Sequence, residues 1–238
     1  MFEGKVAIIT GSAGSLGSAT TKAFLKKKAK VVALYHTEEK FNKFVDALGD
    51  LSENLHGVQG DAMSAEDCKR LVKETIDRHG KVDILVNIVG GWKGGKTLDK
   101  TSEETWDKMI NLNAKTVFLC SREVLPHMID ENYGRIVNIS AKSSTRKGRM
   151  KNSSAYAASK GAVRTLTYAM TEELKDKNIN VNCIMPSTID TEDNRKMIPK
   201  ADFSKWVPPE QIAETVLFLC SDKAKDIKGA CVPIYGKS

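Results

Sequence analysis

A tyrosine and a lysine four positions apart, Tyr156 and Lys160, are the residues of this sequence best suited to acid–base chemistry. Residues i and i+4 lie on one face of a helix, so the phenol and the ammonium group would point the same way. A free phenol titrates near pH 10, and a nearby positive charge lowers that pKa. The pair predicts a general acid/base in which Tyr156 exchanges the proton. Two neighbours on a helix surface without any catalytic role would have the same spacing. The surrounding elements must therefore show whether this pair belongs to an active site.

A glycine-rich segment, TGSAGSLG at residues 10–17, is the second chemical signal. It follows an apolar run and precedes a stretch, from about Ser18 to Lys28, that we expect to be helical. Such a turn lets backbone N–H groups approach a pyrophosphate, which the helix N-terminus also attracts. Gly11 would permit the tight turn, and Gly17 would permit close packing of helix on sheet. The segment predicts a dinucleotide site, although a turn that needs glycines for geometry alone would look similar.

The elements that would position these residues alternate between strands and helices. Between the apolar runs, residues 71–76 and 212–219 show helical spacing of apolar side chains. Strands that are apolar throughout are buried on both faces, as in a parallel sheet. The order predicts an α/β fold of the Rossmann type, a doubly wound parallel sheet of about seven strands with helices on both faces. We expect a single domain over residues 1–238, since no linker divides the chain. The apolar, β-branched runs are residues 6–9, 31–34, 55–58, 82–86, 136–139, 179–184 and 231–234.

The composition excludes several classes of protein. No apolar run approaches the ~18 residues of a membrane span, and the amino terminus lacks a signal peptide, so we expect a cytoplasmic protein without a membrane partner. The five scattered cysteines argue against a disulfide framework and against a metal site, and Cys120 and Cys220 lie in apolar runs typical of a core. The net charge of +7 is spread along the chain, and we expect no nucleic-acid partner.

These motifs, in this order, resemble those of the short-chain dehydrogenase/reductase family over essentially the whole chain. Thr10, Gly11 and Gly17 match the family pattern TGxxxGxG, whereas Ser15 replaces its middle glycine. The resemblance implies an enzyme that transfers hydride between a nicotinamide dinucleotide and a carbonyl or alcohol substrate. It also implies that Tyr156 protonates the carbonyl oxygen, while Lys160 binds the nicotinamide ribose and lowers the pKa of the phenol.

The resemblance assigns further residues to the cofactor. Asp61 stands where the family has an aspartate beside the adenine, and Asn87 and Gly90 are retained from its NNAG motif. Near the carboxyl end of the chain, Pro186, Ile189 and Thr191 would face the nicotinamide carboxamide and the phosphates, with Ser187 replacing a glycine. The whole set of implied cofactor contacts is Gly11, Ser12, Ser15, Leu16, Gly17, Tyr35, His36, Asp61, Ala62, Asn87, Gly90, Lys160, Pro186, Ile189 and Thr191.

The end of the second strand bears on the choice between NAD and NADP. A carboxylate there would bind the ribose hydroxyls of NAD and repel the extra phosphate of NADP. Here Tyr35 takes that position, followed by His36 and Thr37. Without an anion at this position we expect NADP. NAD remains an alternative, because no arginine is present to bind the extra phosphate of NADP.

Two helper residues are implied for the acid/base pair. The family uses an asparagine to hold a water that links the lysine to solvent, and the register set by Trp106 selects Asn113 rather than Asn111. It also uses a serine that hydrogen-bonds the substrate oxygen. Counting thirteen residues back from Tyr156 gives Ser143, with Ser144 beside it, whereas alignment on the strand end gives Ala141 and leaves the role vacant.

Cations surround the expected mouth of the site and could attract an anionic substrate, although a solvated loop would carry similar charges. They are Lys93, Lys96, Lys142, Arg146, Lys147, Arg149 and Lys151. Two segments, GGWKGG and DTEDNRKMIPKADFSKW, are similar to dihydropteridine reductases, which implies as an alternative a quinonoid pterin substrate with Trp92 lining its pocket. A non-catalytic sensor of the dinucleotide is a further alternative. Kinship also implies a homodimer or homotetramer, formed through the helices that follow the fourth and fifth strands.

Overall fold

The structure is a computed structural model that describes residues 2–145 and 150–237. Within these residues, seven strands form one sheet in the order β3-β2-β1-β4-β5-β6-β7, and every neighbouring pair is parallel. This sheet confirms the predicted doubly wound α/β fold. The strands are β1 (Val6–Thr10), β2 (Lys30–Tyr35), β3 (Leu55–Gln59), β4 (Ile84–Asn87), β5 (Gly134–Ile139), β6 (Ile179–Pro186) and β7 (Cys231–Ile234).

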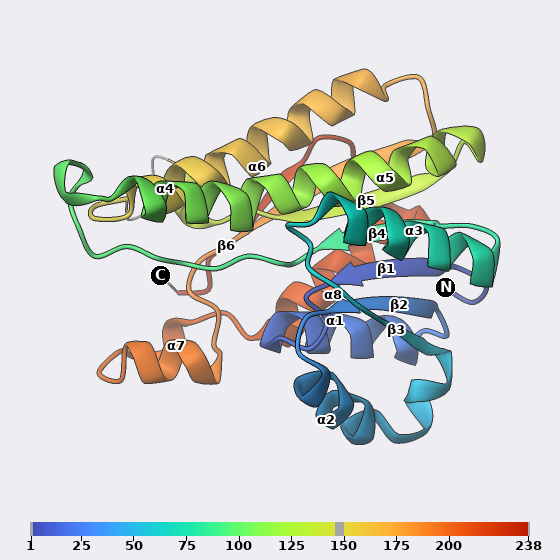
Figure 1. The fold of residues 1–238 in the computed structure, drawn as a ribbon, viewed down its shortest axis with the longest axis horizontal. Helices are drawn as coiled ribbons and strands as arrows, with labels where there is room; N and C mark the ends of the chain where they lie inside the picture. Colours follow the sequence, from blue (N-terminus) through green and yellow to red (C-terminus); the bar gives the residue numbers. More distant parts are fainter. Residues whose placement is uncertain (1, 146–149, 238) are drawn as a thin grey trace.

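Helices cover both faces of the sheet (Figure 1). One layer contains α1 (Ser15–Lys26), α2 (Glu38–Leu48) and α8 (Pro209–Cys220). The opposite layer contains α3 (Ala65–His79), α4 (Glu103–Ile110), α5 (Thr116–Asp130) and α6 (Ser154–Glu173). A short helix, α7 (Glu192–Met197), lies beyond the end of β6, apart from both layers. No helix in the described part of the chain is long and apolar enough to cross a membrane.

The burial of the strands explains why this arrangement forms. Every residue of β1, β4, β5 and β6 is buried, as expected for strands covered on both faces. Side chains alternate between the two faces of each strand, so Ile9 packs toward α1 and α8 while Ile8 packs toward α3 and α5. Cys120 and Cys220 are buried in these two cores, which confirms that they are core residues.

The site is positioned by the reversal of strand order at β1. The chain runs from β1 outward to β2 and β3, and then returns to place β4 on the other side of β1. The carboxyl ends of β1 and β4 are therefore adjacent at this reversal, which is the place where doubly wound folds bind their ligands. The sequence motifs at residues 10–17 and 87–90 lie at this point.

Candidate active site

The glycine-rich turn holds α1 close against the end of β1. Gly11 has a φ of +68°, a conformation that favours glycine. A Cβ on Gly17 would lie 2.0 Å from the carbonyl oxygen of Gly11, so no side chain fits between helix and turn. The helix begins at Ser15, three residues before the predicted start. Its first turn, all of which the structure describes, contains no acidic residue, so the positive end of the helix dipole is not neutralised there.

The other residues expected in this turn differ in how they are placed. Ser15 is exposed at the start of α1, whereas Leu16 is buried in the core. Ser12 is fully buried, and its hydroxyl donates to the carbonyl oxygen of Leu34 at 3.4 Å. Ser15 alone of these three has a side chain free to meet a phosphate, and Ser12 and Leu16 can contribute only through the backbone.

Thr10 ties the glycine-rich turn to the loop that follows β4. Its hydroxyl oxygen accepts hydrogen bonds from the backbone N–H groups of Ile88 at 3.0 Å and Val89 at 3.2 Å. A Cβ on Gly11 would lie 3.2 Å from the Val89 side chain, which shows how closely the two loops approach. The sequence motif identified Thr10 but gave no sign of its bonds to the loop after β4.

The end of β2 presents an aromatic stack where the NAD-binding carboxylate would stand. The Tyr35 ring lies parallel to that of Phe41, with 4.0 Å between centroids. Both rings cover Gly57 of β3, where a Cβ would be 2.4 Å from the Phe41 ring. This packing fixes Tyr35, while His36 beside it is exposed. The role of Phe41 was not foreseen, because only the structure brings β3 and the start of α2 together.

The remaining dinucleotide candidates lie at the ends of β3 and β4. The Asp61 carboxylate accepts a hydrogen bond from the Met63 N–H at 2.8 Å, and Ala62 between them is buried. Asn87 is also buried, and its amide donates to Asn138 Oδ1 at 2.9 Å. Asn87 therefore links β4 to β5 inside the molecule, and Asp61 stiffens the turn after β3.

Lys160 and Asn113 both approach Gly90, in the loop that follows β4. A Cβ on Gly90 would lie 2.7 Å from Asn113 Oδ1 and 3.0 Å from Lys160 Nζ. Lys160 is 5% exposed, and its ammonium group donates to the carbonyl oxygen of Ile139 at 2.8 Å. Three motifs distant in the sequence thus converge, because α6 and the α4–α5 helical segment flank the loop after β4.

Asn113 is held by a single π-helical turn, residues 111–115, between α4 and α5. Its side-chain oxygen accepts the Gly91 N–H at 3.0 Å, and its amide nitrogen lies 3.1 Å from both the Met109 carbonyl oxygen and the Ser159 hydroxyl. The Ser159 hydroxyl in turn donates to the carbonyl oxygen of Tyr156 at 2.8 Å. Sequence periodicity did not reveal the π turn, and Ser159 was identified by neither motif nor spacing.

Burial shifts the pKa values of the acid/base pair in opposite directions. The Tyr156 side chain is half-buried, and burial raises the pKa of its phenol to about 12. Burial of the Lys160 ammonium group lowers its pKa to about 8. The expected lowering of the Tyr156 pKa is therefore wrong for the protein without its cofactor, because burial disfavours the charged phenolate.

The Ser143 hydroxyl is buried and has no hydrogen-bond partner among the described residues. The hydroxyls of its neighbours are occupied, since Ser144 donates to the Ala141 carbonyl oxygen at 2.7 Å and Ser140 donates to the Lys160 carbonyl oxygen at 2.8 Å. Ala141 itself is the second residue after β5 and offers no side-chain donor. Ser143 thus has an unpartnered hydroxyl among the described residues, unlike Ser140 and Ser144 beside it.

The segment after β6 is fixed by hydrogen bonds of its own. Pro186 ends β6 opposite Ile234, and Ile189 forms an isolated bridge with Val207. The Thr191 hydroxyl accepts the Asn194 N–H at 3.2 Å and caps α7. Ser187, where the family has glycine, donates its hydroxyl to the Tyr235 carbonyl oxygen at 2.8 Å.

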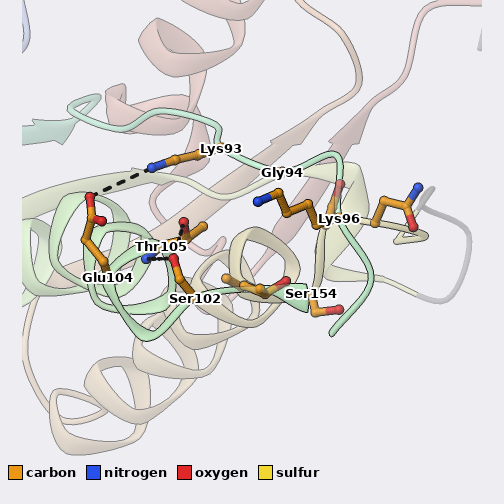
Figure 2. A pocket seen from close by; sticks show the side chains of 11 residues that line it. Lys93, Gly94, Lys96, Ser102, Glu104, Thr105 and Ser154 are labelled. Atoms are coloured by element: carbon orange, nitrogen blue, oxygen red, sulfur yellow. Dashed lines mark hydrogen bonds and ion pairs between the residues drawn. The ribbon is translucent and has the colours of Figure 1, made fainter. Parts of the chain in front are cut away.

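A pocket of about 280 Å³ opens at the N-terminal ends of α4 and α6, directly before Tyr156 in the chain (Figure 2). Lys93 lies 4.0 Å from the Glu104 carboxylate, whereas Lys96 makes no ion pair with any described residue. Among the other predicted cations, Lys142 lies 4.9 Å from the Tyr235 ring centre and Lys151 is exposed. Arg146, Lys147 and Arg149 lie outside the described residues. The pocket is lined by Lys93, Gly94, Lys96, Thr101, Ser102, Glu104, Thr105, Asn152, Ser153, Ser154 and Ala155.

Comparison with known proteins agrees with this geometry. A family model described as short chain dehydrogenase matches residues 5–202. The chain is 32% identical to the 3-oxoacyl-acyl-carrier-protein reductase FabG of Thermotoga maritima, over 99% of this chain and 98% of that protein. It is 35% identical to an NAD-dependent glycerol dehydrogenase of Listeria innocua, over 98% of this chain and 92% of that protein. Among solved structures, ElxO with NADP bound superposes with a TM-score of 0.91 at 27% identity, over 98% of this chain and 97% of that one.

The chain therefore belongs to the short-chain dehydrogenase family. It is an oxidoreductase that acts on hydroxyl or carbonyl groups of small molecules, and the family to which it belongs uses NAD or NADP.

Proposed function

We propose that this enzyme reduces a small carbonyl compound, or oxidises the matching alcohol, with NADP as its preferred cofactor and Tyr156 as its acid/base. One domain, residues 1–238, would carry both the dinucleotide site and the substrate site. The observation that carries the proposal is the meeting of Lys160 and Asn113 over Gly90, beside the turn that contains Gly11. Burial of the Lys160 ammonium group costs free energy, which favours a functional reason for its place beside Gly90.

The residues present fit a nicotinamide dinucleotide. No side chain fits at Gly17 or at Gly90, so α1 lies close against the glycine-rich turn, and Asn113 and Lys160 lie close against the loop after β4. The α1 N-terminus and Ser15 would bind the pyrophosphate, and Lys160 would bind the nicotinamide ribose. The bound dinucleotide would supply or accept the hydride and, in its oxidised form, add a positive charge to the site.

Tyr156 would exchange its proton at the phenol oxygen. With a pKa of about 12 the phenol holds its proton at neutral pH, yet it can protonate an alkoxide, which is a much stronger base. Lys160, with a pKa of about 8, is largely protonated at neutral pH and would favour the phenolate that remains. The unpartnered Ser143 hydroxyl would donate a hydrogen bond to the substrate oxygen, and Asn113 would hold the water that links Lys160 to solvent.

The preference for NADP rests on the end of β2. Tyr35 and its stack on Phe41 occupy the place where a carboxylate would select NAD, and the exposed His36 could approach a 2′-phosphate. The structure of ElxO with NADP bound favours the same choice, while the glycerol dehydrogenase of Listeria innocua is named as NAD-dependent. NAD is therefore the second candidate cofactor.

An anionic substrate is favoured by the pocket that is lined by Ser154 and Ala155, the two residues before Tyr156 in the chain. Lys96 is unpaired there among the described residues, and the pocket is otherwise rich in hydroxyl and amide groups. The 47% exposed Trp92, whose ring would lie 2.8 Å from a Cβ on Gly94, favours a quinonoid pterin as a second substrate class. An exposed ring beside a pocket provides a surface on which a flat heterocycle can stack.

Assembly into a homodimer or homotetramer is proposed through α5 and α6. Phe118 on α5 and Tyr168 on α6 are 46% and 44% exposed, and large apolar side chains on a surface mark contact regions. Light scattering coupled to gel filtration would measure the assembly of the wild-type protein and of Phe118→Asp.

One experiment tests the proposed function. The protein is mixed with NADPH or NADH and with β-keto acids, neutral ketones or quinonoid dihydropterin, and the loss of reduced-nicotinamide absorbance is recorded. We expect turnover with NADPH and a carbonyl compound, and a loss of about 10²–10⁴-fold in kcat for Tyr156→Phe with unchanged cofactor affinity. Tight binding of the dinucleotide without consumption, and no effect of Tyr156→Phe, would instead identify a sensor.

A further inference from the structure

The two carboxyl-terminal strands bring a pair of cysteines together. Cys183 of β6 and Cys231 of β7 are directly opposite each other in the parallel register, although 48 positions separate them in the sequence. Both are free thiols, and Cys183 donates a hydrogen bond to Cys231 with 2.9 Å between the sulfur atoms. Neighbouring strands lie about 4.8 Å apart, within the ~4.4–6.8 Å between Cα atoms that disulfides span. The backbone is thus already placed for a bond between the two sulfur atoms.

The two thiols differ in access to solvent. Cys183 is fully buried, whereas Cys231 is half-buried in β7, the strand at the end of the sheet. On the α6 side, the Tyr168 hydroxyl interacts with the Cys231 sulfur. A small oxidant can therefore reach Cys231 first.

The surrounding groups also give the two thiols different pKa values. The hydrogen bond from Cys183, followed by the hydrogen bond with Tyr168 and the charge of Arg164, lowers the pKa of Cys231 to about 7. The bond to Cys231 and burial raise the pKa of Cys183. Since the thiolate is the nucleophilic form, Cys231 is the reactive member of the pair and Cys183 keeps its proton.

We propose that Cys231 and Cys183 form an oxidation site, in which hydrogen peroxide converts the two thiols into an intramolecular disulfide between β6 and β7. The Cys231 thiolate attacks a peroxide oxygen, the O–O bond breaks, and the departing hydroxide combines with the proton that the thiol had released. The Cys183 sulfur then attacks the resulting sulfenic acid, the S–O bond breaks, and the leaving hydroxide takes the Cys183 proton. The thiols lose two electrons and two protons in total, and the peroxide is reduced to two molecules of water.

A second pair of cysteines provides an internal control for proximity. Cys68 on α3 and Cys120 on α5 lie with their sulfur atoms 3.4 Å apart, but both are buried in the core. Proximity alone would make both pairs react, whereas access to the oxidant would make only the pair on β6 and β7 react. Cys220, also buried, should remain reduced as well.

The test treats the full-length folded protein with graded hydrogen peroxide, and then alkylates the remaining thiols after unfolding. Peptide mapping without reductant should show the loss of two thiols and a peptide cross-linked between Cys183 and Cys231, both reversed by dithiothreitol. Cys231→Ser should prevent the loss of both thiols. Cys183→Ala should leave Cys231 as a sulfenic acid that a dimedone probe captures, and the matched control Cys68→Ala should leave the cross-link unchanged.

Three results would overturn the proposal. The first is that all five thiols survive peroxide in the folded wild-type protein. The second is that Cys68 and Cys120 form a disulfide before the pair on β6 and β7 does. The third is that Cys231 forms a disulfide with Cys231 of another copy, because Cys231 would then not bond to Cys183 of its own chain.

Discussion

Replacing Lys160 by methionine should stabilise the cofactor-free protein at neutral pH while it abolishes hydride transfer. Burial lowers the pKa of Lys160 from 10.5 to about 8. One pKa unit corresponds to about 1.4 kcal/mol, so the charged ammonium group lowers the folding stability by ~3 kcal/mol at neutral pH. Methionine removes this cost but leaves the Ile139 carbonyl oxygen without its donor at 2.8 Å, a loss of roughly 1–3 kcal/mol. The expected net gain is roughly 0–2 kcal/mol.

The pH dependence of this gain in folding stability shows whether the gain comes from removal of a buried charge or from a change in packing. The folded protein releases the Lys160 proton at a lower pH than the unfolded chain, so this group adds stability as the pH rises from about 8 to 10.5. The advantage of Lys160→Met should therefore shrink over that window and reverse above it. Urea unfolding of the wild type and the variant across the window measures the difference, with the exposed Lys223→Met as the control. A difference that stays constant with pH would show that burial of the charge is not its cause.

Three further predictions concern the dinucleotide and substrate sites. Tyr35→Asp should lower kcat/KM for NADPH by roughly tenfold relative to Tyr35→Asn, which lacks the charge. Equal ratios of kcat/KM for NADPH to kcat/KM for NADH in the two variants would contradict this. Lys96→Ala should raise KM several-fold for an anionic β-keto acid in steady-state assays, by roughly the effect of one lost charge contact, whereas Lys100→Ala outside the pocket should not. Equal effects of these two lysine variants would point to general surface charge. Gly17→Ala should weaken NADPH binding at least tenfold in fluorescence titration, because its Cβ would lie 2.0 Å from the Gly11 carbonyl oxygen; an unchanged Kd would mean that α1 can shift.

The fold was predictable because the strands are buried on both faces. Continuous apolar runs such as residues 6–9 and 31–34 have no other common explanation when they alternate with helical stretches. The boundaries were less predictable at the site itself. The helix expected from about Ser18 begins at Ser15, because the glycine-rich turn and the first turn of α1 overlap and Gly17 belongs to both.

Contacts between distant segments account for what the sequence did not reveal. The spacing of Tyr156 and Lys160 indicated a shared helix face, but the pKa of the phenol depends on burial, which spacing does not describe. The cysteines looked scattered, yet Cys183 and Cys231 are neighbours because β6 and β7 pair in a register that only the assembled sheet defines. The pKa of the phenol and the closeness of the two cysteines both depend on position in the fold rather than on residue type.

The π turn at residues 111–115 makes this part of the chain sensitive to insertions and deletions. One residue accounts for about 100° of rotation around a helix, so the extra residue turns α5 relative to α4. With this twist, α4 packs against α6 while α5 packs against α3. Deleting one residue here would produce a more regular helix, but it would rotate Asn113 away from Gly91. It would also rotate either α4 away from α6 or α5 away from α3. Over evolutionary time, length changes should accumulate in the surface loops and spare these five positions.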